Sequence, residues 1–261
     1  MRRSSTFDQG AVITAALQID GLSKTFGDKV AVDQVSLTVP QGSFYGLVGQ
    51  NGAGKTTTLS MAVGLLRPDS GSARIFGVDV WADPSRAKQL VGVLPDAMAM
   101  PERLTGREVL TYLGLLRGLS PEVVAERAAD LLAVLELDSA EKTLVIEYST
   151  GMRKKIGLAT ALLHAPRLLV LDEPFEAVDP VSAATIKKIL RDFVAGGGSI
   201  VLSSHVMALV EQLCDHVGVI DRGRVAAAGP LADVRGGVTL EDRFVELVGS
   251  GSDAAKGLSW L

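Results

Sequence analysis

The chain has 261 residues, of which 47% are hydrophobic and 21% charged, as in ordinary globular proteins with a large core. Its net charge of −4 argues against a nucleic-acid-binding protein that depends on a dominant basic surface. The single cysteine, Cys214, cannot form an internal disulfide, which suits a reducing cytosol. No run approaches 18 uninterrupted apolar residues, so we expect a soluble protein without a membrane span.

The N-terminus has a basic start, MRRSSTFDQG, followed by the short apolar run AVITAALQI. This arrangement loosely resembles a signal peptide. However, Asp8 separates the two parts, and the run continues directly into a plausible strand, LQID. We therefore expect a flexible tail over residues 1–15 rather than a cleaved signal.

Strand-like and helix-like segments alternate along most of the chain. Residues 17–48 read as short strands and turns, because β-branched residues alternate with polar ones. Further strands are predicted at 73–76, 91–95, 168–172, 199–204 and 216–221, and helices at 83–90, 105–119, 120–137, from 149, at 179–195 and at 205–214. This order predicts an α/β fold with a parallel sheet, entered through an antiparallel β region.

The stretch EYSTGMRKK, residues 147–155, places two hydroxyls and a glycine before three cations. Taken alone, it predicts a helix that Ser149 caps and that presents Arg153, Lys154 and Lys155 as a solvated basic face. It leaves open whether the start of this helix also serves a group outside its own chain.

A phosphate-binding pattern follows the apolar strand FYGLV. GQNGAGKTT has the form G-x-x-x-x-G-K-[ST] and opens a helix. Glycines let backbone N–H groups surround a phosphate chain, and the helix N-terminus adds partial positive charge. Lys55 is expected to reach the outer phosphates and Thr56 to coordinate Mg²⁺. The predicted nucleotide contacts are Gly49, Gln50, Asn51, Gly52, Ala53, Gly54, Lys55, Thr56 and Thr57.

Two further buried strands end in candidate catalytic residues. In LLVLDEP, Asp172 is placed to hold Mg²⁺ through a water, and Glu173 to polarise an attacking water. His205, at the end of SSH, is expected to reach the γ-phosphate. The other two histidines, His164 and His216, are interpreted as structural, with His164 favoured by the partial negative charge of a helix C-terminus.

From about Leu17 to Gly249 these motifs resemble the nucleotide-binding subunit of ABC transporters. GQNGAGKTT is similar to Walker A, LLVLDEP to Walker B, SSH to the switch-histidine loop and FEAVDP to the D-loop segment, with Asp179 as its aspartate. Phe26 lies where the family has an adenine-stacking aromatic. The resemblance implies a P-loop NTPase core with a mostly parallel sheet, an N-terminal antiparallel β subdomain and an inserted helical subdomain. We expect one domain over residues 16–249, the helical subdomain at about 98–148 and a tail over 250–261.

YSTGM lies where the family has its signature, commonly LSGGQ. Such subunits form head-to-tail dimers that bury two ATP molecules, each between one Walker A loop and the partner's signature. The resemblance therefore implies that Ser149, Thr150, Gly151 and Met152 contact an ATP held by the other subunit. Thr150 replaces a usual glycine and Met152 a usual glutamine, whereas Gly151 keeps the small residue.

Asp96 falls where the family's Q-loop has a glutamine that contacts Mg²⁺ and links the site to the membrane partner. Aspartate ligates Mg²⁺ but is shorter and charged. We expect Asp96 to stay away from the γ-phosphate until the dimer closes.

The resemblance implies an ATPase subunit that uses ATP and Mg²⁺ to power a membrane exporter. Its partners would be a second ATPase subunit, most simply a second copy, and an integral-membrane permease on a separate chain, but no nucleic acid. It would be cytoplasmic, bound peripherally to the inner face of the cell membrane, and its ending resembles subunits of ABC-2-type exporters. The alternatives are an importer subunit, a weakly hydrolysing regulatory cassette, and a soluble ABC ATPase acting on ribosomes or DNA.

Overall fold

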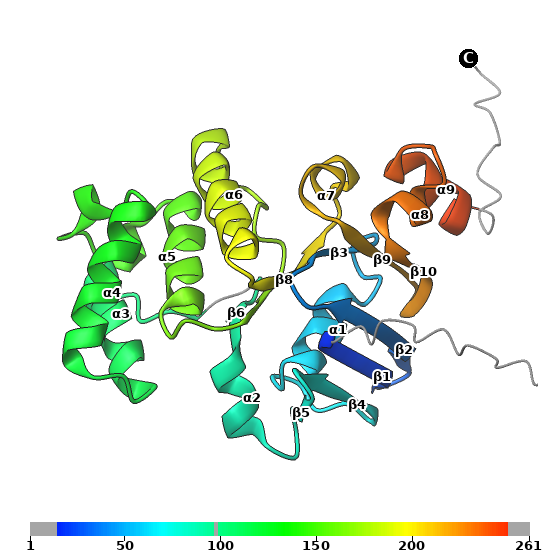
Figure 1. Cartoon of the computed structure of the whole chain (residues 1–261), viewed down its shortest axis with the longest axis horizontal. Helices are drawn as coiled ribbons and strands as arrows, with labels where there is room; N and C mark the ends of the chain where they lie inside the picture. Colours follow the sequence, from blue (N-terminus) through cyan, green and yellow to red (C-terminus); the bar gives the residue numbers. More distant parts are fainter. Residues whose placement is uncertain (1–14, 97–98, 250–261) are drawn as a thin grey trace, which may run out of the picture.

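The computed structural model describes residues 15–96 and 99–249 (Figure 1). The predicted N-terminal tail, apart from Ala15, and the predicted C-terminal tail lie outside the described residues, as does the signal-like segment up to residue 14. Among the helices that the structure describes, none has the length and apolar character needed to cross a bilayer.

A four-stranded antiparallel sheet forms the N-terminal part of the fold. Its strands are β1 (Ala15–Phe26), β2 (Lys29–Pro40), β4 (Ser70–Ile75) and β5 (Val78–Asp79), in the order β2-β1-β4-β5. In β2 the buried Val35, Leu37 and Val39 alternate with exposed residues, as expected for a sheet with one covered face. The covered face packs onto α1 (Lys55–Ala62) and the second sheet, and Leu37 and Tyr45 belong to the same hydrophobic cluster.

The second sheet has the order β10-β9-β3-β8-β7-β6. Its strands are β3 (Phe44–Val48), β6 (Val91–Leu94), β7 (Leu168–Leu171), β8 (Ser199–Ser204), β9 (His216–Asp221) and β10 (Arg224–Pro230). All are parallel except β10, and β3, β7 and β8 are buried throughout. The parallel strands end at one edge, so the residues that follow β3, β6, β7 and β8 meet there. The predicted α/β fold with its antiparallel entry is confirmed.

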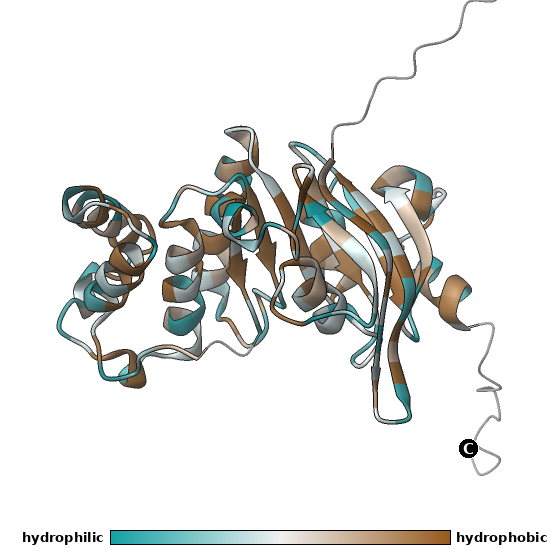
Figure 2. Ribbon diagram, turned by 90° about the horizontal axis from the view of Figure 1, so that it is seen from below, coloured by the Kyte–Doolittle hydropathy of each residue, from teal (hydrophilic) through white to brown (hydrophobic). Residues whose placement is uncertain are grey.

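Helices cover the sheets and form a separate group at one end of the molecule. Figure 1 shows α3, α4 and α5 side by side at the end away from β1 and β2. Figure 2 shows hydrophobic residues along both the strands and the helices. The helices are α1 (Lys55–Ala62), α2 (Pro84–Leu90), α3 (Gly106–Leu116), α4 (Pro121–Val134), α5 (Thr150–Leu162), α6 (Pro180–Ala195), α7 (Met207–Leu213), α8 (Leu231–Arg235) and α9 (Leu240–Gly249).

The helix starts follow local capping chemistry. Ser120, Ser149 and Asp179 each accept a backbone N–H bond from the first turn of α4, α5 and α6. Thr105 and Glu108 form a reciprocal capping box at the start of α3. These four starts agree with the sequence analysis, whereas β10, α8 and α9 were not predicted. The β10 sequence, RVAAAGP, is poor in residues that favour strands, and its pairing with β9 places it.

His164, just after α5, lies in an environment that disfavours its charged form. Its Nε2 atom is 3.0 Å from the Val91 carbonyl oxygen. Burial of the ring, reinforced by the nearby Arg117 and Arg127 guanidinium groups, lowers the pKa of His164 to about 4. Arg127 also donates to the Leu163 carbonyl at the helix end. The expectation that the helix C-terminus favours charge on His164 is therefore wrong, because burial and two cations outweigh it.

This low pKa predicts a pH-dependent stability. An unfolded histidine titrates near pH 6.5, so between about pH 6.5 and pH 4 the unfolded chain binds a proton that the folded chain excludes. The contribution of neutral His164 to the stability of the fold is complete above pH 6.5 and is lost as the pH falls through this window. We expect the free energy of unfolding, measured in urea, to fall by about 1–2 kcal/mol from this group between pH 7.5 and pH 5.

His164→Gln is the matched control for this prediction. Glutamine can still donate to the Val91 carbonyl but does not titrate. The variant protein should therefore lose less stability than wild type over the same pH range. Equal pH dependence in the two proteins would show that His164 is not the group responsible.

Candidate nucleotide-binding site

The loop between β3 and α1 is shaped by glycines. A Cβ atom on Gly49 would lie 2.3 Å from the Ile220 carbonyl oxygen, so only glycine fits beside β9. Gly54 has a φ of +106° and precedes α1 without any side-chain cap. The first N–H groups of α1 therefore have no capping side chain and can donate to an anion.

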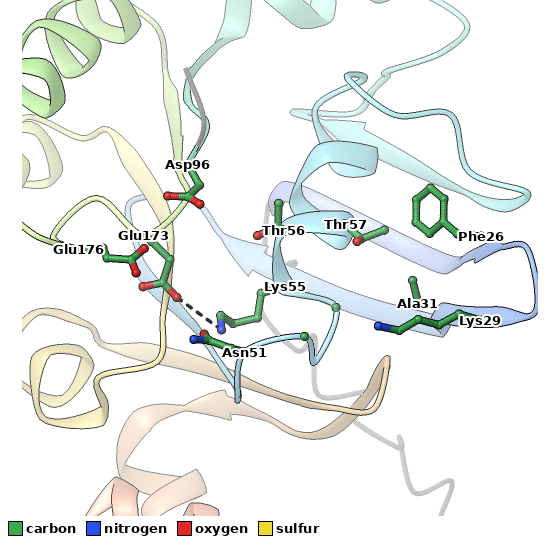
Figure 3. Close-up of a pocket in the computed structure, with 12 residues that line it drawn as sticks. Phe26, Lys29, Ala31, Asn51, Lys55, Thr56, Thr57, Asp96, Glu173 and Glu176 are labelled. Carbon is green, nitrogen blue, oxygen red and sulfur yellow. Dashed lines mark ion pairs between the residues drawn. The ribbon is translucent and has the colours of Figure 1, made fainter. Parts of the chain in front are cut away.

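Lys55 is buried at the base of this loop, with 6% of the residue exposed. Its Nζ atom donates to the carbonyl oxygens of Gly49 and Gln50, at 2.8 and 3.3 Å. It also lies 3.4 Å from Glu173 Oε1, the ion pair drawn in Figure 3. The ammonium group is thus held between the loop and the end of β7, where the oxygens of a phosphate can accept a further hydrogen bond from it.

A cavity of about 380 Å³ opens beside Lys55, within the usual range for ligand sites. Figure 3 shows Phe26 and Lys29 at one end, and Asp96, Glu173 and Glu176 at the other. Phe26, at the end of β1, is half-exposed, with Lys24 Nζ 5.8 Å from its ring centroid, and the exposed part of the ring can stack on a flat group. The lining residues are Phe26, Lys29, Ala31, Asn51, Gly52, Gly54, Lys55, Thr56, Thr57, Asp96, Glu173 and Glu176.

Three predicted loop residues do not line this cavity. Gly49 serves the packing against β9 described above. Gln50 and Ala53 instead face a second hollow of about 310 Å³, which α9 closes through Phe244 and Val245. The loop therefore borders both cavities, and Asn51 and Gly52 line the two of them.

Asp172 and Glu173 follow β7 and are joined by a residue that the sequence analysis did not single out. The Ser203 hydroxyl donates to the buried Asp172 Oδ1, and it accepts the Glu173 backbone N–H at 2.9 Å. Glu173 has a φ of +45°, a conformation that costs energy for a residue with a side chain. The sequence did contain a signal for Ser203, because SSH places this residue at the end of a predicted strand. That strand is β8, the neighbour of β7.

The Glu173 carboxylate faces both the cavity and His205. His205 Nδ1 lies 3.1 Å from Glu173 Oε2, and Lys55 lies on the other oxygen. The Glu173 side chain is only 12% exposed, whereas that of His205 is 39% exposed. The carboxylate is thus fixed from two sides next to the phosphate loop, a position from which it can accept a proton from water.

Oxygen ligands suitable for a hard cation meet at the same place. Thr56 and Asp96 line the main cavity and also an adjoining hollow of about 220 Å³ that Asp172 lines. Hydroxyl and carboxylate oxygens are the donors that Mg²⁺ prefers. Within residues 15–96 and 99–249 there is no cluster of three His, Cys, Asp or Glu side chains that could hold a metal alone. The set fits Mg²⁺ completed by phosphate oxygens and water.

The signature-like residues and Asp179 lie outside the main cavity. Ser149 Oγ accepts the Met152 N–H at 3.2 Å, so the start of α5 caps itself. A Cβ atom on Gly151 would lie 2.8 Å from Asp179 Oδ2, so glycine lets α5 and the start of α6 approach closely. Hydrogen bonding, first from the Ser182 backbone, lowers the pKa of the Asp179 carboxyl. One chain therefore does not bring Ser149–Met152 and Lys55 to a common cavity.

The three cations of α5 do not form the solvated face that EYSTGMRKK alone predicted. Arg153 donates to the Ile146 carbonyl at 2.8 Å. Lys155 is buried and lies 3.3 Å from Glu136 Oε2. Lys154 donates to the Glu173 carbonyl at 3.0 Å. That expectation is wrong because tertiary contacts, which helix periodicity does not reveal, give each cation a partner.

Comparison with known proteins agrees with this geometry. Residues 32–176 match the family described as ABC transporter. The daunorubicin/doxorubicin resistance ATP-binding protein DrrA of Streptomyces peucetius is 39% identical, over 85% of this chain and 67% of that protein. The Nod factor export ATP-binding protein I of Cupriavidus metallidurans is 39% identical, over 83% and 72%. A solved ATP-binding subunit of an ABC transporter superposes with a TM-score of 0.82 at 30% identity, over 89% of this chain and 99% of that one. The chain belongs to the ABC transporter family, as one of its ATP-binding, ATP-hydrolysing subunits.

Proposed function

We propose that this chain binds Mg²⁺ and ATP in the cavity beside Lys55 and hydrolyses ATP to power an exporter. The observation that carries the proposal is the position of Glu173. Its carboxylate is fixed between Lys55 and His205, next to the uncapped N-terminus of α1. A carboxylate held beside a phosphate-binding loop is suited to act as general base on the attacking water.

Each residue has a specific part in this proposal. Phe26 stacks on adenine, and the loop N–H groups with Lys55 hold the phosphates. Thr56, Asp172 and Asp96 would hold Mg²⁺, which supplies charge neutralisation at the phosphates when bound. Glu173 accepts the proton of water, and His205 orients the γ-phosphate and that water.

A second subunit completes the site. Ser149, Thr150, Gly151 and Met152 start α5 outside the cavity that Lys55 lines, as does Asp179 at the start of α6. We assign them to an ATP held by a partner copy, in a head-to-tail dimer of domains spanning residues 16–249. The helical subdomain at about 98–148 would move when the dimer closes.

The exporter assignment rests on the relatives. Two of them are named for drug resistance and for Nod factor export. We infer that this chain serves a separate integral-membrane permease and is bound through it to the cytoplasmic face of the membrane. Movement of the helical subdomain and of the segment that contains Asp96 would transmit ATP binding to that permease.

Dimerisation is the first test. Glu173→Gln should retain ATP without turning it over, so its molar mass, measured by light scattering after size exclusion, should double with MgATP and remain monomeric without it. Thr150→Glu places a carboxylate where the partner's phosphates would lie, and in this background it should abolish the ATP-dependent dimer. An unchanged dimer in the double variant would contradict the assignment of α5 to the partner's ATP.

The permease is tested on membranes. The tagged chain should copurify from detergent-solubilised membranes with one integral-membrane protein in fixed stoichiometry. ATP turnover of that complex in vesicles should depend on Glu173 in this chain. If no membrane protein copurifies while the isolated chain hydrolyses ATP, the exporter assignment fails and the soluble ABC ATPase remains.

A further inference from the structure

Lys154 connects α5 to the residue proposed as the general base. It lies one helical turn after Thr150, and its side chain is 12% exposed. Its Nζ atom donates to the Glu173 carbonyl at 3.0 Å and lies 3.4 Å from Asp96 Oδ1. One ammonium group therefore contacts the segments that follow both β6 and β7.

Glu173 needs such contacts because its backbone is strained. Its φ of +45° is a conformation that persists only where the surroundings fix it. Ser203 accepts the Glu173 N–H, and Lys154 donates to its carbonyl, which also accepts the Glu176 backbone N–H at 3.2 Å. A side chain therefore contacts each polar group of this residue's backbone. Ser203 belongs to the sheet, whereas Lys154 belongs to α5, the helix that begins with the signature-like residues.

Lys154 contacts Glu173 without lining the nucleotide cavity. The cavity that Lys55 lines includes Asp96 and Glu173 but not Lys154. Lys154 instead lines a separate hollow of about 160 Å³ that also contains Thr150 and Met100. Any effect of Lys154 on the nucleotide in the cavity of its own chain therefore passes through Glu173 or Asp96.

The positive charge of Lys154 also offsets the repulsion expected between the Asp96 carboxylate and bound phosphates. The Asp96 carboxylate lines the cavity expected to receive a polyanion, where an unpaired negative charge opposes binding. The ion pair with Lys154 reduces this opposition and gives the carboxylate a positively charged partner.

We infer that Lys154 is a positioning residue for ATP hydrolysis. It holds the strained Glu173 peptide through its carbonyl, pairs with Asp96, and thereby makes the orientation of the general base depend on the position of α5. This inference rests on the proposed role of Glu173. If α5 contacts the partner's ATP through its first turn, Lys154 links that event to the catalytic residue of its own site.

The test is the steady-state ATPase of Lys154→Met in the full chain. Methionine keeps the length and packing of the stem but removes the ammonium group. We expect kcat to fall about 10- to 100-fold, the size of effect seen when a catalytic group is displaced by about 1 Å, with KM for ATP changed by less than about threefold. Lys154→Arg, which keeps a donor and the charge, should recover part of kcat.

Lys155→Met is the matched control. Lys155 is the next residue of the same helix and is buried at 5% exposure, but it pairs with Glu136 and does not contact Glu173. Its kcat should stay within about threefold of wild type. Equal losses of kcat in the two methionine variants, or wild-type kcat in Lys154→Met, would overturn the inference.

A second pair of variants separates the two contacts. Asp96→Asn removes the charge that Lys154 compensates, so adding Lys154→Met to it should leave KM unchanged and still lower kcat about 10- to 100-fold. If the added change no longer affects kcat, Lys154 acts through Asp96 alone and the contact with Glu173 has no positioning role. A wild-type chain without any turnover would instead overturn the proposed function itself.

Discussion

Glu173→Gln should lower kcat for ATP hydrolysis by at least about 100-fold while leaving the affinity for ATP within about threefold. The amide keeps the size of the side chain but cannot accept a proton from water. Because Lys55 also donates to the Gly49 and Gln50 carbonyls, the phosphate loop should keep its shape without the Glu173 charge. Phosphate release and binding of a fluorescent ATP analogue measure the two quantities.

Glu176→Gln is the informative comparison. Glu176 is three residues away in the same segment and lines the same cavity. The structure pairs Glu173, and not Glu176, with Lys55 and His205. Its amide variant should keep kcat within about threefold of wild type. A larger loss of kcat in Glu176→Gln than in Glu173→Gln would show that Glu176, and not Glu173, is the general base.

Gly92→Ala should destabilise the fold by about 3 kcal/mol or more, although the substitution adds one methyl group to a residue that does not line the nucleotide cavity. Gly92 lies in β6, at the edge of the parallel sheet where α5 packs. A Cβ atom there would lie 2.1 Å from the Ala161 carbonyl oxygen and 2.9 Å from Leu169 Cδ2. The obstacle is the backbone of α5, so no rotamer change relieves the overlap. Urea unfolding followed by circular dichroism measures the loss.

Gly196→Ala controls for the change of residue type. Gly196 follows α6 with a φ of −77°, and a Cβ atom there would meet nothing closer than 3.4 Å. Its free energy of unfolding should stay within about 0.5 kcal/mol of wild type. A Gly92→Ala protein as stable as Gly196→Ala would show that α5 does not approach β6 as closely as described.

The sequence by itself determined the features whose residues are close together along the chain. The phosphate loop is readable because Gly49–Thr57 contains both the turn and the helix start that bind phosphate. The starts of α4, α5 and α6 are readable because a cap acts within three residues. The alternation of strands and helices predicted the α/β class for the same reason, since each element reflects a local pattern.

Only the tertiary structure decided which distant residues meet. The sheet order places β8 between β3 and β7, and this brings Ser203, His205 and Lys55 to Glu173. It also gave the cations of α5 their partners and lowered the pKa of His164, against what the helix pattern indicated. Hydrophobic periodicity specifies which face of an element is buried, but not which element covers that face. Contacts that depend on the covering element therefore appear only when the whole chain has folded.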